Sequence, residues 1–129
     1  MTENEVATTI VDACFRIHTS LGPGLLESVY ETVLAHELRQ RGLHVQRQTP
    51  VPVSWCGMQF DEGFRADLIV EDLVIVELKS VEQVAPVHAK QLLTYLRLTG
   101  KRLGLLANFG EARMKDGLKR VVNGLPDDA

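Results

Sequence analysis

The segment VIVELKS, Val74 to Ser80, decides the fold because it is typical of a buried strand that ends in charged residues. Side chains alternate along a strand, so Glu77 and Lys79 point to one face while Leu78 points to the other. Charged side chains are rarely buried unless they are paired or bind something. The segment therefore predicts either an ordinary polar strand end or a functional site.

The preceding segment, FRADLIV (64–70), supplies a partner strand that carries Asp67 among apolar residues. A two-residue hairpin loop would put Asp67 and Glu77 on opposite faces of the sheet, whereas a three-residue loop would set them opposite each other. Directly opposed residues have Cβ atoms about 4.5–5.5 Å apart, and like charges there repel. The three-residue loop, residues 71–73, therefore predicts two carboxylates held close together.

Two adjacent carboxylates suit a hard divalent cation, Mg²⁺ or Mn²⁺, since Mg²⁺ uses one or two carboxylates in proteins. The backbone carbonyl of Leu78 is a further candidate oxygen ligand. Lys79 stands beside the pair, where an ammonium group can orient a nucleophilic water or stabilise transition-state charge. The spacing is thus consistent with a metal site flanked by a lysine, and the plainer interpretation, three polar residues at strand ends, stays open.

The rest of the chain predicts a mixed α/β domain with a central sheet. Helical spacing of apolar residues runs from about residue 4 to 20, and again from 25 to 41 after Gly22-Pro23-Gly24. The expected order is α-α-β-β-β-β-α-β. The strands expected before the third helix are LHVQRQ, VPVSW, FRADLIV and VIVELKS, the helix spans about residues 87–98, and RLGLLANF is the last clear strand. The segment GLKRVVN is open between a short strand and a helical turn.

Size and composition leave several classes of protein open. The chain has 129 residues, 45% hydrophobic and 24% charged, which predicts one domain over residues 1–129. The sequence contains no run of 18 apolar residues, so we expect no membrane-spanning helix. The net charge of −3 argues against strong sequence-independent binding of nucleic acid. Cys14 and Cys56 fit no metal pattern, so we expect free thiols in a reducing cytoplasm.

Several motifs occur together and in a consistent order. Gly24-x-x-Glu27-x-x-Tyr30 begins the second helix, D-x₉-E-x-K joins the two strands, and NFG follows the last strand. Together they resemble the GxxExxY family of small bacterial proteins, which is assigned to the PD-(D/E)XK nuclease superfamily. The resemblance runs from about residue 6 to 123, with Ala66 standing where the superfamily motif has proline.

The resemblance implies a restriction-endonuclease-like core with the site carboxylates on two neighbouring strands. It implies that Asp67 and Glu77 are the metal carboxylates and that Lys79 is the catalytic lysine. It also implies that Glu27 is an additional helical carboxylate, which reaches the metal directly or through water. Gln91 and Tyr95 match a Q-x-x-x-Y pair that lies near the lysine and the phosphate. Two plainer interpretations stay open. Glu27 also suits a helix N-terminus, where negative charge is stabilised, and shares its helix face with Tyr30 and Glu31. Gln91 and Tyr95 also suit an ordinary amphipathic helix.

Two functions remain as hypotheses. The first is a Mg²⁺-dependent nuclease that hydrolyses DNA in preference to RNA. The second is an inactive module that keeps the nuclease fold and binds nucleic acid or a protein partner. A homodimer would enlarge the contact surface under either hypothesis, and the sequence leaves the oligomeric state open.

Overall fold

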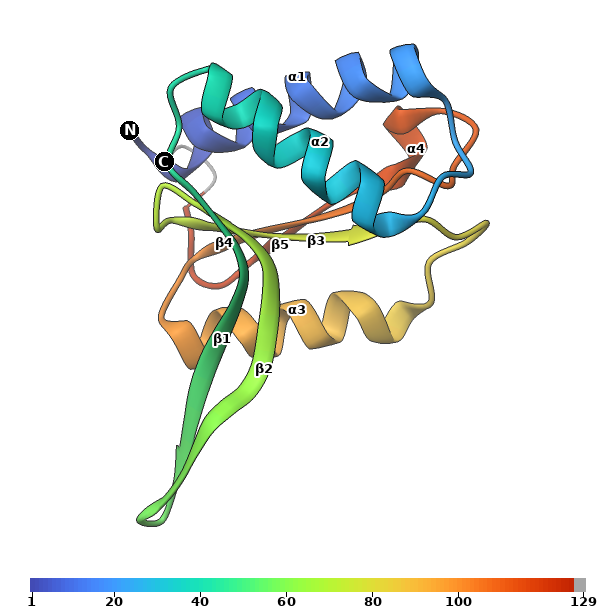
Figure 1. Cartoon of the computed structure of the whole chain (residues 1–129). Coiled ribbons are helices and arrows are strands. Elements are labelled where there is room, and N and C mark those ends of the chain that lie inside the picture. The colour runs from blue at the N-terminus through green and yellow to red at the C-terminus, as the bar shows by residue number, and fades with distance from the viewer. Residues whose placement is uncertain (127–129) are drawn as a thin grey trace.

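The computed structural model describes residues 1–126 and contains one five-stranded sheet with helices on both faces (Figure 1). The elements in chain order are α1 (Glu3–Leu21), α2 (Glu27–Gln40), β1 (Val45–Trp55), β2 (Met58–Val70), β3 (Val74–Lys79), α3 (Pro86–Thr99), β4 (Leu103–Asn108), α4 (Met114–Gly117) and β5 (Leu118–Val122). This architecture confirms the expected restriction-endonuclease-like α/β class.

The sheet has the strand order β1-β2-β3-β4-β5. Only β3 and β4 are parallel, because α3 crosses between them, and the other neighbouring pairs are antiparallel. Val70 pairs with Val74, so the loop between β2 and β3 is the three-residue loop that the sequence analysis required. Glu71 and Asp72 adopt left-handed backbone conformations in this loop. The Glu71 carboxylate accepts the His44 N–H at 2.8 Å, which helps to hold the turn.

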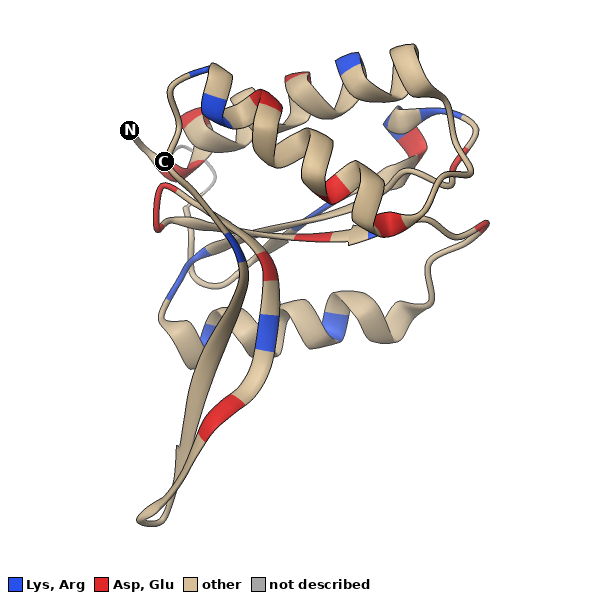
Figure 2. Ribbon diagram, viewed as in Figure 1, with Lys and Arg blue, Asp and Glu red and all other residues tan. Residues whose placement is uncertain are grey.

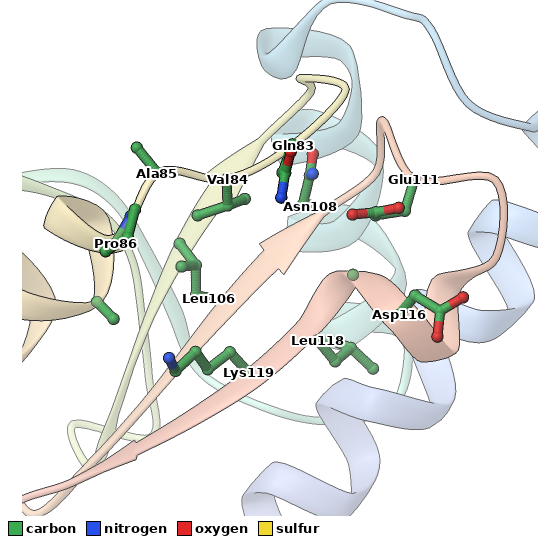
Figure 3. Close-up of a pocket in the computed structure, with 12 residues that line it drawn as sticks. Gln83, Val84, Ala85, Pro86, Leu106, Asn108, Glu111, Asp116, Leu118 and Lys119 are labelled. Atoms are coloured by element: carbon green, nitrogen blue, oxygen red, sulfur yellow. The ribbon is translucent and has the colours of Figure 1, made fainter.

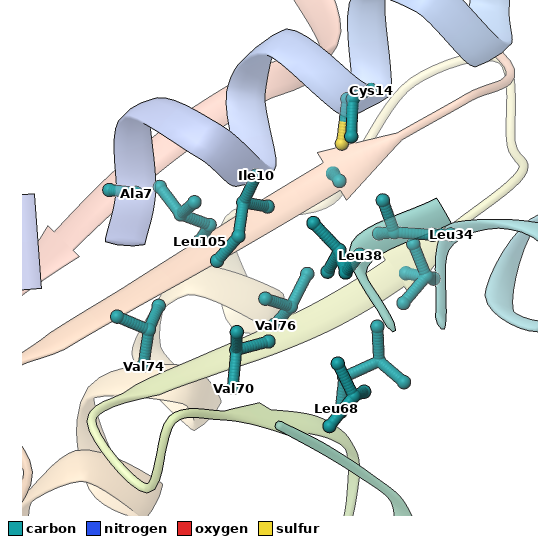
Figure 4. Close-up of a cluster of buried hydrophobic side chains, with 14 of the residues drawn as sticks. Ala7, Ile10, Cys14, Leu34, Leu38, Leu68, Val70, Val74, Val76 and Leu105 are labelled. Atoms are coloured by element: carbon teal, nitrogen blue, oxygen red, sulfur yellow. The ribbon is translucent and has the colours of Figure 1, made fainter. Parts of the chain in front are cut away.

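Two apolar layers enclose the sheet. Alternate residues of β2 and β3 pack upward against α1 and α2, as Figure 4 shows for Leu68, Val70, Val74 and Val76. The residues between them pack against α3 on the other face, in a smaller cluster. That cluster consists of Ala66, Ile69, Ile75, Leu92, Leu96, Leu106 and Val121. Because both faces are covered, the central strands are apolar on both sides, as the sequence suggested.

The strand count before α3 differs from the expectation. The segments expected as two strands, LHVQRQ and VPVSW, form one long strand, β1, and MQF joins FRADLIV in β2. Pro50 lies within this strand, and β1 is at the edge of the sheet, where proline is tolerated. The β1–β2 pairing shifts register between Val51 and Val53, and beyond that point the hairpin projects from the body (Figure 1).

The segment GLKRVVN, which its sequence left open between a strand and a helical turn, forms the strand. Residues 118–122 make β5, which pairs with β4, and the one-turn helix α4 ends at Gly117, just before it. Within residues 1–126, no helix is both long and apolar enough to cross a membrane. Cys14 is buried in the core, and Cys56 is exposed in the hairpin turn.

The tyrosine of the G-x-x-E-x-x-Y motif holds the turn that begins α2. The Tyr30 hydroxyl donates to the Gly22 carbonyl at 2.5 Å and accepts the Leu25 N–H at 3.1 Å. Its ring is fully buried and stacks on Phe109, with ring centroids 4.5 Å apart. The Ser80 hydroxyl, just after β3, donates to the Leu25 carbonyl at 2.5 Å. The end of β3 and the start of α2 are therefore fixed relative to each other.

Replacing Tyr30 with phenylalanine is expected to lower the free energy of unfolding by about 1–3 kcal/mol, because two hydrogen bonds at a buried position are lost. Tyr95→Phe is the matched control, since the Tyr95 hydroxyl bonds to no residue between Met1 and Pro126, and it should change stability by less than about 0.5 kcal/mol. Urea denaturation of both variants measures the difference. Equal effects would show that the Tyr30 hydroxyl does not hold this turn.

Candidate active site

Asp67 and Glu77 lie at the point where β2 separates from β3. Regular pairing ends at Leu68 and Val76, one residue before the two acids. There the Asp67 N–H donates to Glu77 Oε2 at 2.8 Å, and the Leu78 N–H donates to Asp67 Oδ2 at 2.9 Å. Each carboxylate therefore occupies a place that a backbone carbonyl would fill in a continuing ladder. This brings the two acids together, as the three-residue loop predicted.

The two carboxylates are costly to ionise together. Burial, and after it the charge of Asp67, raise the pKa of Glu77 to about 8, although the Asp67 N–H and the charge of Lys79 act in the opposite direction. Burial also raises the pKa of Asp67, with a further contribution from the charge of Glu31, while the Leu78 N–H lowers it. The positive charge around the two acids is too small to stabilise both in their ionised forms. A divalent cation bound between them would neutralise this negative charge.

Lys79 is the last residue of β3 and lies in register with Asn108 of β4. It is half-buried, and its ammonium group has no carboxylate within 4.0 Å among residues 1–126. Its charge lowers the pKa of both Asp67 and Glu77. The lysine is therefore near the two acids but not committed to an ion pair. The Leu78 N–H already holds Asp67, and the role of the Leu78 carbonyl as a ligand stays a prediction.

Glu27 lies at the first position of α2 and faces Asp67 across a pocket of about 340 Å³. The residues that line this pocket are Glu27, Ser28, Glu31, Gln48, Asp67 and Leu78. The fold thus brings Glu27 to the side of Asp67, and its direct contact with a metal stays a prediction.

Gln48 and Glu31 belong to this pocket but were not identified as site residues from the sequence. The Gln48 amide donates to Glu31 Oε1 at 2.5 Å and to Asp67 Oδ1 at 3.3 Å. Glu31 is buried and also accepts Arg47 Nη2 at 3.1 Å. Glu31 shares a helix face with Glu27, which was a usable signal. No sequence signal pointed to Gln48, because its backbone departs from ordinary strand geometry.

Tyr95 and Gln91 differ in how they relate to the site. The Tyr95 ring stacks on Phe64 with centroids 3.9 Å apart, and burial together with the charges of Glu77 and Asp67 raises the pKa of its hydroxyl. Tyr95 therefore lies close to the acids. Gln91 is exposed one turn earlier in α3, and it forms no hydrogen bond with the described part of the chain. The amphipathic interpretation of Gln91 accordingly stays open.

The residues present fit a small divalent cation with few protein ligands. Within residues 1–126, no three His, Cys, Asp or Glu side chains gather in an arrangement that could hold a metal ion. The site instead offers two carboxylates, Asp67 and Glu77. Burial raises the pKa of both, and the charge of Asp67 contributes to the raised pKa of Glu77. Mg²⁺ usually keeps several waters and binds through one or two carboxylates. This donor set suits a hard divalent cation such as Mg²⁺ or Mn²⁺, which keeps several waters. It does not suit a metal ion that needs a full set of protein ligands.

A second pocket, of about 260 Å³, lies under the loop that follows β3 and beside α4 and β5 (Figure 3). Asn108 supports this loop, since its side-chain oxygen accepts the N–H groups of Val81 and Gly110, both at 3.0 Å. A side chain on Gly110 would collide with Val81, with its Cβ 2.2 Å from the Val81 carbonyl oxygen. The NFG segment therefore fixes the chain just after Lys79 and contributes no group to the acid pair.

Comparison with known proteins agrees with this geometry. A family model described as the PD-(D/E)XK nuclease superfamily matches residues 4–121. Neither the curated proteins nor the solved structures gave a match. The match covers nearly the whole chain and includes both strands that carry the acids and the lysine. The chain belongs to the PD-(D/E)XK nuclease superfamily.

Proposed function

We propose that this protein is a Mg²⁺- or Mn²⁺-dependent nuclease of the GxxExxY type that hydrolyses phosphodiester bonds in DNA in preference to RNA. The observation that carries the proposal is the pair formed by Asp67 and Glu77, two half-buried acids joined through backbone N–H groups. Lys79 lies beside them and forms no ion pair with any described residue. Superfamily membership supports nuclease chemistry, and nucleases of this superfamily generally use divalent metal ions.

Each residue has a role that follows from its position. Asp67 and Glu77 would hold the cation, which supplies Lewis-acid activation of water and stabilisation of phosphate charge when bound. Lys79 would stabilise the negative charge that develops on the phosphate oxygens, and within residues 1–126 no ion pair competes for its ammonium group. Glu27, across the pocket from Asp67, would order water on the α2 side of the site.

The surface near the site supports contact with a polyanion. Lys90 and Arg97 lie on exposed positions of α3, and neither has a carboxylate within 4.0 Å among residues 1–126. Figure 2 shows these basic positions along α3, on the side of the sheet that carries Tyr95. Phosphate contacts of this kind supply affinity without sequence specificity. A DNA backbone that passes along α3 would therefore reach the acid pair.

Replacing Lys79 with alanine is expected to lower the cleavage rate by about 100-fold or more, because transition-state charge loses a partner worth roughly 3 kcal/mol. Cation binding should persist, since both carboxylates remain. Cleavage of single- and double-stranded DNA and RNA with Mg²⁺ or Mn²⁺ measures the first effect, and calorimetric titration with Mn²⁺ measures the second. Lys115→Ala, an exposed lysine on α4, is the matched control.

The alternative is an inactive module that binds nucleic acid or a protein partner through the same fold. Equal cleavage by wild type and Lys79→Ala would indicate a contaminating enzyme and would remove the proposed activity. A wild-type protein that binds DNA but shows no cation-induced increase in melting temperature would support the inactive module. Comparing DNA with RNA in one assay decides the substrate preference.

A further inference from the structure

We propose that Gln48 is a positioning residue that fixes the orientation of the Asp67 carboxylate for cation binding, an inference that rests on the proposed function. Gln48 belongs to β1 and lies opposite Asp67 in the β1–β2 register, because Arg47 pairs with Leu68 and Thr49 pairs with Ala66. Asp67 is therefore flanked by Gln48 on one neighbouring strand and by Glu77 on the other.

The hydrogen bonds show how Gln48 acts on Asp67. The Leu78 N–H holds Oδ2 from β3 at 2.9 Å, and the Gln48 amide holds Oδ1 from β1 at 3.3 Å. A carboxylate held through one oxygen still rotates about its terminal torsion, which has broad preferences. Holding both oxygens, from two different strands, fixes the plane of the Asp67 carboxylate.

The Gln48 amide also separates two acids. Its Nε2 group donates to Glu31 Oε1 at 2.5 Å as well as to Asp67. Glu31 is itself held by Arg47 through contacts of 3.1 and 3.3 Å to Oε2. Glu31 therefore serves as a fixed support for the amide, and the amide keeps this third carboxylate from approaching Asp67. Glu31 on α2 thus holds the Gln48 amide, and the amide holds Asp67. Glu31 itself is not proposed as a cation ligand.

The backbone at Gln48 is consistent with a functional constraint. Its φ of 47° lies in the left-handed region, which is uncommon for a residue other than glycine and rare within a strand. Strained conformations of this kind persist where the surrounding structure holds them, often at functional sites. Here the strained conformation accompanies a side chain that reaches both Glu31 and Asp67. We expect the amide, not the backbone shape, to matter for cation binding.

The test compares Gln48→Met, which keeps the length and the strain but loses the amide, with Gln48→Gly, which loses the amide and relieves the strain. Calorimetric titration with Mn²⁺ should show the dissociation constant rising about tenfold or more in both variants, as for other residues that orient metal ligands. In metal-free urea denaturation, Gln48→Gly should unfold at a higher urea concentration than Gln48→Met. Gln46→Met, exposed on the same strand, is the control and should bind Mn²⁺ like wild type.

The outcomes separate this inference from the proposed function. Wild-type affinity for Mn²⁺ in Gln48→Met would overturn the role of Gln48 while leaving the nuclease proposal intact. Weakened binding in Gln48→Met but not in Gln48→Gly would also overturn it, since the amide is absent from both. A wild-type protein that binds no Mn²⁺ would overturn the proposed function and, with it, the role of Gln48. Weakened binding in both variants, with the control unchanged, supports the inference.

Discussion

Replacing Asp67 with asparagine is expected to reduce cleavage by about 100-fold or more and to abolish cation-induced stabilisation, while the protein stays folded. Asparagine has nearly the same shape, and its side-chain oxygen can still accept the Leu78 N–H that now holds Asp67 Oδ2 at 2.9 Å. The lost group is the negative charge, which carries several kcal/mol of cation-mediated transition-state stabilisation in such sites.

Three measurements check this prediction together: DNA cleavage at saturating Mg²⁺, melting temperature with and without Mg²⁺, and urea denaturation without metal. Asp61→Asn is the matched control, because Asp61 lies on the same strand but is exposed in the projecting part of the β1–β2 hairpin. A variant at Asp67 that still melts at a higher temperature with Mg²⁺ would show that the cation binds elsewhere. A variant that unfolds without metal would show that the carboxylate is needed for folding.

The metal-free protein is expected to lose stability as the pH rises from about 5 to 8. The pKa of Glu77 is near 4.5 in the unfolded chain and about 8 in the folded protein, so the folded state holds the extra proton in this range. Because the folded state binds more protons than the unfolded chain in this range, the free energy of unfolding falls as the pH rises, by up to a few kcal/mol. The raised pKa of Asp67 acts in the same direction. Urea denaturation at several pH values with EDTA present measures the slope.

Glu77→Gln should flatten this pH dependence, whereas Glu82→Gln, an exposed acid in the loop after β3, should leave it unchanged. Mg²⁺ should restore stability at pH 8, by about 2.7 kcal/mol at a hundred times its dissociation constant. Increasing stability of the metal-free wild type between pH 5 and 8 would contradict the placement of Glu77 as a buried, uncompensated acid.

The sequence predicted those parts of the site that depend on strand periodicity. Alternation along β2 and β3, with an odd number of loop residues, was enough to bring Asp67 and Glu77 together, because pairing fixes which side chains are neighbours. The apolar stripes of the helices likewise predicted which faces are buried. These predictions held because each follows from a single repeating geometry.

The features that the sequence did not predict depend on local departures from such geometry. Gln48 contacts Asp67 from a backbone that leaves the strand conformation. The sequence LHVQRQ contains no glycine or other signal that would predict a left-handed conformation at Gln48. LHVQRQ and VPVSW were expected as two strands but form one, which is possible because an edge strand accommodates Pro50. The role of Tyr30 as a hydrogen-bonding anchor for the Gly22 turn required three-dimensional contacts between distant segments.

A crystal structure of the wild-type protein soaked with Mn²⁺ would show whether Asp67 and Glu77 hold a cation, because anomalous scattering locates the ion without ambiguity. We expect one anomalous peak between the two carboxylates, with oxygen ligands at about 2.0–2.3 Å. An absent peak at saturating Mn²⁺, or a peak bound only by other residues, would show that the two acids do not form a metal site.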